Sequence, residues 1–237
     1  MRIKSLIFLG ILATILVSCQ SNEQTENKKL VGDVVTAEVQ QSLTPDDVLK
    51  DLINGNDRFV SGKLIERDLS RQVKNSENGQ YPKAVVLSCL DSRVPVEYIL
   101  DQGIGDIFVG RIAGNIVDID MIGSMEFACK VAGSKLVMIL GHENCGAVKG
   151  SIDDVKLGNL TETLAEIKPA IEMSKDFQGE KSSKNAEYVD YVCRNNVLNT
   201  INKIRTQSST LKEMEENGEI KIVGGVYDLT DGRITFF

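Results

Sequence analysis

Three short, continuous apolar runs stand out in the central part of the chain, and each contains β-branched residues. They cover residues 84–87, 107–109 and 136–140. Runs of this length are typical of strands buried on both faces, as in a parallel sheet with helices on either side. The intervening segments 97–102 and 122–131 are suited to be crossover helices. The pattern therefore predicts an α/β fold with a mostly parallel central β-sheet flanked by helices.

Helical periodicity and strand character continue outside these runs. Thr44 is suited to cap a helix that starts at Pro45 and has two acidic residues in its first turn, and Gly55 suggests the end of this helix. Apolar residues at three- and four-residue steps predict later helices, and closing strands with a hairpin turn at Asp231 and Gly232 follow. These helices are expected over 162–175 and 186–205, and the strands over 220–223 and 224–237.

The N-terminal residues have the pattern of an export signal. Arg2 and Lys4 precede an apolar stretch of 13 residues, which is shorter than the ~20 residues of a membrane-spanning helix. The stretch ends in the letters LVSC, which resemble a bacterial lipobox, where the signal is removed before a cysteine that is then lipidated. Residues 1–18 are therefore interpreted as a lipoprotein signal peptide and Cys19 as the lipidated residue. A buried hydrophobic helix is the alternative.

A polar segment rich in Gln, Asn, Glu and Lys follows the cysteine. This composition is typical of flexible linkers. Residues 19–42 are therefore expected to be the lipidated cysteine and a flexible tether, and residues 43–237 a single folded domain. The protein is expected to be exported and lipid-anchored to a bacterial membrane, on its periplasmic or cell-surface side.

Charge and metal-binding side chains narrow the function. The chain has 27 basic and 34 acidic residues and a formal net charge of −7. Because nucleic-acid binding depends on neutralising phosphates, we expect no nucleic-acid partner. The single histidine excludes a three-histidine metal site and a second histidine acting as a base or proton shuttle. Of the five cysteines, Cys129 and Cys193 lie in apolar helical patterns and are expected to be inert core thiols.

Three candidate metal ligands follow two of the predicted strands. Cys89 comes after the first apolar run, and His142 and Cys145 come after the third. Ligands gather at the carboxyl ends of parallel strands, so these side chains are expected to face one ion. Two thiolates and one imidazole suit zinc, and a fourth position open to water would make the site catalytic. The spacing alone leaves a buried thiol and a turn histidine as the alternative.

Longer motifs around these residues resemble a known family. SCLDSRVP at 88–95 and GHENCGAV at 141–148 resemble the two signature motifs of the β-class carbonic anhydrases, and FVGRIAGN at 108–115 is similar to the segment between them. The resemblance covers residues 43–237. It implies a carbonic anhydrase (carbonate dehydratase, a lyase) that reversibly hydrates carbon dioxide to bicarbonate and a proton. It also implies one zinc ion per chain as cofactor, with zinc-bound hydroxide as the nucleophile.

The resemblance assigns roles to individual residues. Cys89, His142 and Cys145 match the zinc ligands. Asp91 and Arg93 match a catalytic pair in which the arginine holds the aspartate off the metal in an open form of the site, whereas the aspartate is the fourth ligand in a closed form. The subgroup that closes has a tryptophan in its regulatory bicarbonate pocket. This chain has no tryptophan, so the open form is expected.

Three further residues are expected to contact the substrate. Gln80 matches a glutamine that orients the substrate in the open subgroup, Phe108 matches an apolar wall of its pocket, and Gly146 belongs to the second motif. Arg111 belongs to the segment between the motifs, and the plainer expectation is that it only bonds backbone at a turn.

Two other functions and the assembly stay open at this point. The same site could hydrolyse carbon disulfide or carbonyl sulfide. The chain could instead be a non-catalytic zinc-binding lipoprotein, which would be favoured if Asp91 permanently filled the fourth zinc position. The family pattern implies a homodimer or homotetramer, in which the helix near residues 44–60 wraps a partner.

Overall fold

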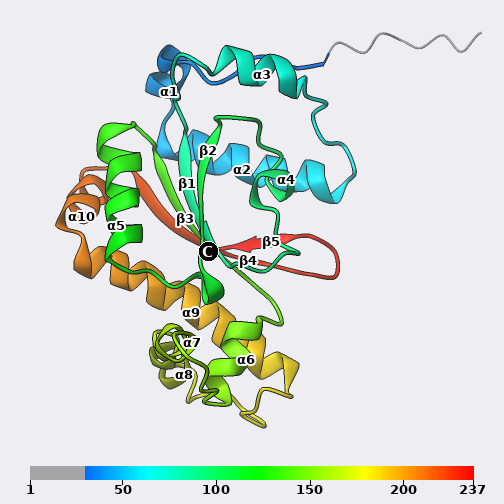
Figure 1. Ribbon diagram of the computed structural model, residues 1–237, viewed down its shortest axis with the longest axis vertical. Helices are drawn as coiled ribbons and strands as arrows, with labels where there is room; N and C mark the ends of the chain where they lie inside the picture. The colour runs from blue at the N-terminus through cyan, green and yellow to red at the C-terminus, as the bar shows by residue number, and fades with distance from the viewer. Residues whose placement is uncertain (1–29) are drawn as a thin grey trace, which may run out of the picture.

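The protein, described here by a computed structural model of residues 30–237, is built around one five-stranded sheet (Figure 1). The strands are β1 (Ala84–Ser88), β2 (Ile107–Arg111), β3 (Leu136–His142), β4 (Lys221–Tyr227) and β5 (Ile234–Phe236). Their order is β2-β1-β3-β4-β5. The first four are parallel to their neighbours, and β5 is antiparallel to β4. The predicted α/β fold with a mostly parallel sheet is therefore confirmed.

Helices cover the sheet and form a further cluster beyond the carboxyl ends of its strands (Figure 1). A 3₁₀ turn, η1 (Ala113–Asn115), follows β2. A π-helical turn, η2 (Phe127–Val131), continues α5. The α-helices are α1 (Ala37–Ser42), α2 (Pro45–Val60), α3 (Leu69–Asn75), α4 (Val96–Ile99), α5 (Ile119–Glu126), α6 (Gly146–Ile152), α7 (Leu160–Ala165), α8 (Lys168–Met173), α9 (Ala186–Gln207) and α10 (Ser209–Glu216).

Successive residues of the central strands face opposite sides of the sheet. Val85 and Leu87 of β1 pack with α5, α9 and α10 in one apolar cluster, whereas Ala84 and Val86 pack with α2 and α4 in another. Because strand residues alternate between the two faces, an uninterrupted apolar run requires helices on both. All residues of β1 and β3 are buried, and the edge strand β2 is partly buried.

The register of the sheet brings the ends of β1 and β3 together. Ser88, at the end of β1, pairs with Leu140 of β3 on one side and with Arg111 of β2 on the other. Cys89 therefore leaves the sheet close to His142, the last residue of β3. The candidate ligands are delivered to one edge of the sheet, as the sequence predicted.

The helix predicted to start at Pro45 is α2, but it does not end at Gly55. Its N-terminus has the expected cap at Thr44, and the helix continues to Val60. A Cβ at Gly55 would lie 1.9 Å from the carbonyl oxygen of Leu100. The glycine allows α2 to approach the end of α4 closely, so the prediction that it ends the helix was wrong.

The helix predicted over 162–175 is interrupted and forms α7 and α8. Pro169 lies in the first turn of α8. Proline has no backbone N–H and clashes with a preceding helical turn, so it begins a new helix here. The helix predicted over 186–205 and the hairpin between the last two strands are confirmed, as α9 and the β4–β5 connection.

The folded structure begins earlier than predicted. Residues 30–42, which were expected to belong to the flexible tether, include α1. The buried side chain of Gln40 donates to the carbonyl oxygens of Pro82 and Ala132. These contacts attach the segment to the domain, so the domain boundary lies before residue 43.

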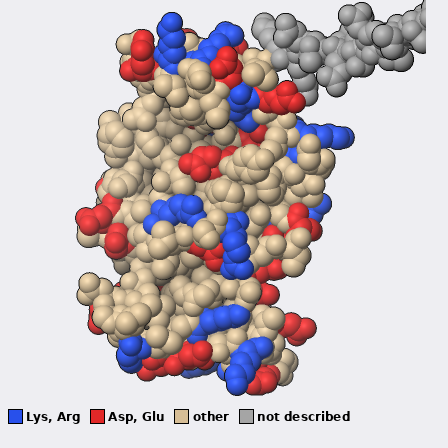
Figure 2. Space-filling view, turned by 45° about the vertical axis from the view of Figure 1, so that its right-hand side comes forward, with Lys and Arg blue, Asp and Glu red and all other residues tan. Residues whose placement is uncertain are grey.

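The signal peptide predicted over residues 1–18 and the lipidated Cys19 lie outside the described residues. Within residues 30–237, no helix is both long enough and apolar enough to cross a membrane. On the face shown in Figure 2, lysine and arginine side chains are interspersed with aspartate and glutamate.

Candidate metal centre

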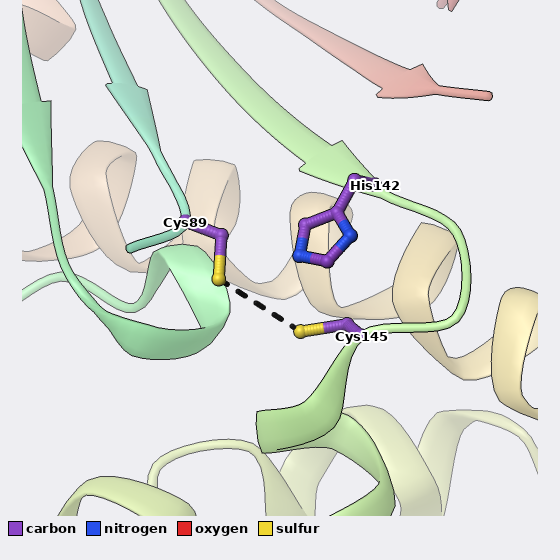
Figure 3. A group of neighbouring side chains, drawn as sticks. All are labelled: Cys89, His142 and Cys145. Carbon is purple, nitrogen blue, oxygen red and sulfur yellow. Dashed lines mark hydrogen bonds between the residues drawn. The ribbon is translucent and has the colours of Figure 1, made fainter. Parts of the chain in front are cut away.

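Cys89, His142 and Cys145 come together at the carboxyl edge of the sheet (Figure 3). One ligand atom from each lies within 4.8 Å of the other two, and all three residues are buried. The two sulfur atoms are 3.9 Å apart. The structure thus brings together the three residues that the sequence proposed as metal ligands.

The turn from β3 into α6 presents two of the ligands to the same point. His142 ends β3, and Cys145 is the N-cap residue of α6. Between them, Asn144 has a φ of 53°, a left-handed conformation that asparagine adopts more readily than most residues. Its backbone N–H donates to the carboxylate of Asp190 in α9 at 2.8 Å. Turn chemistry and a contact with α9 therefore fix the spacing of the two ligands.

The tautomer of His142 is set by the neighbouring backbone. Nδ1 lies 2.8 Å from the carbonyl oxygen of Glu143, so Nδ1 carries the proton and donates it. Nε2 then presents a lone pair; it is buried and has no hydrogen-bond partner among residues 30–237. A buried acceptor that faces two sulfur atoms, with its ring fixed through the second nitrogen, has the geometry of a metal ligand.

The donor set fits zinc in geometry and in chemistry. With Zn–S distances of about 2.3 Å, two thiolates of a tetrahedral site lie roughly 3.8 Å apart, close to the 3.9 Å between the sulfurs of Cys89 and Cys145. Two sulfurs and one imidazole match zinc better than hard cations such as magnesium. Three protein ligands leave one tetrahedral position for a small molecule, which is the pattern of catalytic zinc sites.

The two thiols of the centre differ in acidity. The pKa of Cys89 is lowered, chiefly by the hydrogen bond with Cys145 and less by the Gly114 N–H, against the opposing effect of burial. The pKa of Cys145 is raised by the same sulfur neighbour and by burial. Before a metal binds, the pair therefore shares one proton. Zinc binds thiolates, so its binding releases that proton.

Asp91 lies beside the ligands and is held by Arg93. The guanidinium donates Nε to Oδ1 at 2.9 Å and Nη2 to Oδ2 at 2.7 Å, and the backbone N–H of Arg93 also donates to Oδ1. Oδ2 is 3.7 Å from Nε2 of His142. The pKa of the Asp91 carboxyl is lowered, mainly by Arg93, so this group is an ionised acceptor at the mouth of the centre.

Arg111, at the end of β2, supports the loop that carries Cys89 and Asp91. Its Nε donates to the carbonyl oxygen of Cys89 at 3.0 Å, and its Nη2 donates to the carbonyl oxygen of Asp91. Arg111 therefore bonds the backbone, and it does so at one metal ligand and at the aspartate beside the ligands.

The residues expected to contact the substrate are placed differently. Gly146 begins α6, and apart from its two chain neighbours and the backbone of its own helix no described atom lies within 4 Å of the position that a Cβ there would take, so it leaves open space next to Cys145. Gln80 is exposed and precedes β1, at the opposite end of that strand from Cys89. Phe108 packs at the edge of the sheet, with its ring 6.3 Å from that of Phe127. Neither Gln80 nor Phe108 lies at the metal centre of its own chain.

Sequence reasoning did not identify the residues behind Cys89. The backbone N–H of Gly114 donates to the Cys89 sulfur at 3.3 Å, and Asn196 of α9 donates to the carbonyl oxygen of Gly114 at 2.7 Å. The sequence did offer one signal for Asn196, namely a polar residue in the row of positions that the predicted helix over 186–205 buries. One row of buried residues at every fourth position of α9 consists of Tyr188, Val192, Asn196, Thr200 and Ile204.

Comparison with known proteins agrees with this geometry. Residues 84–234 match the carbonic anhydrase family model. Carbonic anhydrase 2 of Mycobacterium tuberculosis is 34% identical over 192 residues, covering 78% of this chain and 88% of that protein. The carbonic anhydrase of Mycolicibacterium smegmatis is equally similar, at 34% over 192 residues, covering 78% of this chain and 89% of that protein. One of two tetrameric β-carbonic anhydrases of Sordaria macrospora matches with a TM-score of 0.63 and 25% identity, over 81% of this chain and 97% of that one. With a cysteine–histidine–cysteine zinc centre at the end of a parallel sheet, the chain belongs to the β-class carbonic anhydrase family.

Proposed function

We propose that this chain hydrates carbon dioxide with an open metal centre, in which Arg93 keeps Asp91 off the zinc. One observation carries the proposal: Asp91 lies next to the three ligands, yet its carboxylate accepts two hydrogen bonds from the Arg93 guanidinium. Three protein ligands with a free fourth position suit turnover. A non-catalytic zinc protein would require the fourth position to be filled, and the Asp91–Arg93 pair argues against that.

The residues of the centre have separate tasks in hydration. Zinc, when bound, lowers the pKa of a water molecule from 15.7 toward about 7, so hydroxide is available to attack carbon dioxide near neutral pH. Asp91, an ionised acceptor, takes a hydrogen bond from the attacking group and so orients its lone pair. Arg93 holds the carboxylate in that position. The thiolates of Cys89 and Cys145 offset the metal charge, so turnover is expected to rise on the alkaline side of neutral.

The proton released by hydration leaves without a second imidazole. The only histidine in the sequence is a ligand, and its Nδ1 is engaged with the carbonyl oxygen of Glu143. Solvent, buffer and surface carboxylates are the remaining acceptors. Proton removal is therefore expected to limit turnover when the buffer is dilute.

Stopped-flow hydration of carbon dioxide by the zinc-loaded protein tests this function. We expect catalysis by the wild type and by Cys129→Ser, which changes a buried thiol of the apolar cluster that contains α5, α9 and α10. Cys145→Ser should lose both zinc and activity, because serine is a poor zinc ligand. Hydrolysis of carbonyl sulfide and carbon disulfide is measured on the same preparation. A protein that consumes either of these faster than it hydrates carbon dioxide would overturn the substrate assignment.

We propose that the enzyme is exported and held by a lipid on Cys19 to a bacterial membrane, facing the periplasm or the cell surface. The order of basic residues, apolar stretch and LVSC in the sequence supports this. Metabolic labelling with a fatty-acid analogue in a bacterial host is the test. We expect label on the wild type and none on Cys19→Ser. An unlabelled wild type that stays in the cytoplasm would contradict the proposal.

We propose further that a second copy binds at the open edge of β2. Among residues 30–237, this strand has no neighbour on its outer side, and a groove of ≈ 780 Å³ beside it is lined by apolar residues that include Met121 and Phe127. Ile119 and Val131, on the same helical segment, are 75% and 72% exposed. A free strand edge beside an exposed apolar groove is typical of an interaction surface. The Sordaria macrospora relative is tetrameric.

Sedimentation of groove variants tests this assembly. Gly123→Arg places a long cation in the groove, where the glycine has free space around it, and it should convert the oligomer to monomers. Glu180→Arg, on an exposed loop, is the control and should not. A wild type that sediments as a monomer would contradict the proposal. Gln80 and Phe108 lie away from the metal centre of their own chain, so their predicted substrate contacts would have to be made at the metal centre of another copy in the oligomer. Phe108 lines the groove where this copy would bind.

A further inference from the structure

Behind the metal centre, one backbone N–H points at a ligand sulfur. Gly114 donates its N–H to Sγ of Cys89 at 3.3 Å, and both residues are buried. Hydrogen bonds to a coordinating thiolate draw electron density from the sulfur and so tune the metal. The geometry of η1 is therefore important to the metal as well as to the fold.

η1 is held in a conformation that few residues adopt. Gly114 has a φ of 73°, and Asn115 has a φ of 43°. A Cβ at Gly114 would lie 2.6 Å from Cδ1 of Ile167, so glycine is required there on steric grounds as well. Left-handed backbone is unfavourable for a residue with a side chain, so this turn needs support from its surroundings.

α9 supplies that support through two buried polar side chains one helical turn apart. Asn196 donates Nδ2 to the carbonyl oxygen of Gly114 at 2.7 Å, and Thr200 donates Oγ1 to the carbonyl oxygen of Asn115 at 3.2 Å. Asn196 and Thr200 are each only 1% exposed. They occupy positions of a buried stripe where apolar residues are the usual choice, and their contacts with η1 account for their polarity.

We propose that Asn196 and Thr200 are positioning residues for the zinc centre. By holding η1, they keep the Gly114 N–H on the Cys89 sulfur, which holds this ligand in place for zinc and sets the donor strength of the sulfur. This inference rests on the proposed zinc centre and adds to it a support that does not touch the metal or the substrate.

The contact can be tested directly in the wild-type protein loaded with a spin-active cadmium isotope in place of zinc. A hydrogen bond from an amide to a metal-bound sulfur transmits scalar coupling between the metal nucleus and the amide proton. We expect such coupling at the amide proton of Gly114. A spectrum in which that proton shows no coupling to the metal would overturn the proposal without any substitution.

Substitution of the two supports tests their positioning role. Asn196→Leu and Thr200→Val remove the donor groups and keep the approximate side-chain size. We expect each to raise the zinc Kd, measured by chelator competition, about tenfold. The sulfur-to-metal charge-transfer band of the Co²⁺-loaded protein should also move to longer wavelength, because the sulfur of Cys89 becomes more electron-rich.

Two further variants complete the experiment. Thr200→Ser keeps the hydroxyl and should retain the wild-type Kd and band. Thr206→Val is the matched control, since it makes the same change on the exposed face of α9, and it should also match the wild type. If the wild type binds no zinc, the proposed function itself is wrong. If the wild type binds zinc but Asn196→Leu and Thr200→Val match it, or if Thr206→Val changes as much as they do, the positioning role is wrong.

Discussion

The Asp91–Arg93 pair makes a specific prediction for Arg93→Met. The guanidinium holds the carboxylate by bonds of 2.9 and 2.7 Å, and Oδ2 is only 3.7 Å from Nε2 of His142. Without the arginine, the carboxylate is free to turn toward the three ligands. We therefore expect Asp91 to become a zinc ligand in this variant and to compete with the reacting groups.

The size of the effect follows from the two hydrogen bonds. Charge-assisted bonds of this kind contribute about 1.5–3 kcal/mol each when shielded from water. The Arg93 side chain is 52% exposed and that of Asp91 is 16% exposed, so solvent screening reduces the pair to about 2 kcal/mol in total. Since about 1.4 kcal/mol is a factor of ten, kcat/KM for carbon dioxide hydration should fall about 30-fold, with zinc content unchanged.

A double-mutant cycle decides whether the effect passes through the carboxylate. Stopped-flow kinetics are measured for the wild type, Arg93→Met, Asp91→Asn and the double variant, all loaded with zinc. A neutral asparagine amide is a weak zinc ligand, so Arg93→Met should change kcat/KM less than about threefold in the Asp91→Asn background. An equal fall in both backgrounds would refute the reasoning, because Arg93 would then act without Asp91.

Three further predictions concern protons and metal removal. With the only histidine engaged as a ligand, kcat should rise steeply with buffer concentration, and buffer-independent turnover would contradict the proposed proton exit. Burial, with the neighbouring carboxylates Asp228 and Asp190, raises the pKa of Glu143 from 4.5 to about 7. Between these two pH values the folded state therefore binds more protons than the unfolded state, so the protein loses stability as the pH rises through this range. Allowing for solvent screening, Glu143→Gln should raise the free energy of unfolding of the metal-free protein by about 1 kcal/mol at pH ~8 and leave it unchanged at pH ~4. If urea titrations give the same difference between variant and wild type at both pH values, the effect does not come from the raised pKa of Glu143. After the metal is removed with a chelator, dioxygen should oxidise Cys89 and Cys145, whose sulfurs are 3.9 Å apart, to a disulfide. An unchanged number of free thiols after aeration would contradict this.

The fold and the ligand set were predictable because they depend on local patterns. An apolar run buried on both faces specifies a parallel strand, and the residue after it emerges at the carboxyl edge of the sheet. The same reasoning brings Cys89, His142 and Cys145 to one place, where the structure has them. The Asp91–Arg93 contact was expected only from the resemblance to the β-class carbonic anhydrases, and the structure has the two side chains hydrogen-bonded.

The parts that sequence reasoning missed depend on contacts between distant segments. Gly55 was interpreted as a helix end, because a close approach of Leu100 to α2 leaves no trace in the local sequence. Asn196 carries no motif, and its role follows from the position of α9 against η1. The substrate contact of Gln80 was assigned by resemblance and stays a prediction, because Gln80 lies at the other end of β1 from Cys89 and would need the centre of another copy.

Zinc K-edge X-ray absorption of the loaded wild-type protein tests the central claim most directly. The account predicts one zinc per chain, with two sulfur neighbours at about 2.3 Å and two nitrogen or oxygen neighbours at about 2.0–2.1 Å, one of which changes when bicarbonate is added. A first shell with one sulfur, or one that stays unchanged in excess bicarbonate, would contradict the account that Cys89, His142 and Cys145 hold a zinc ion with one exchangeable position.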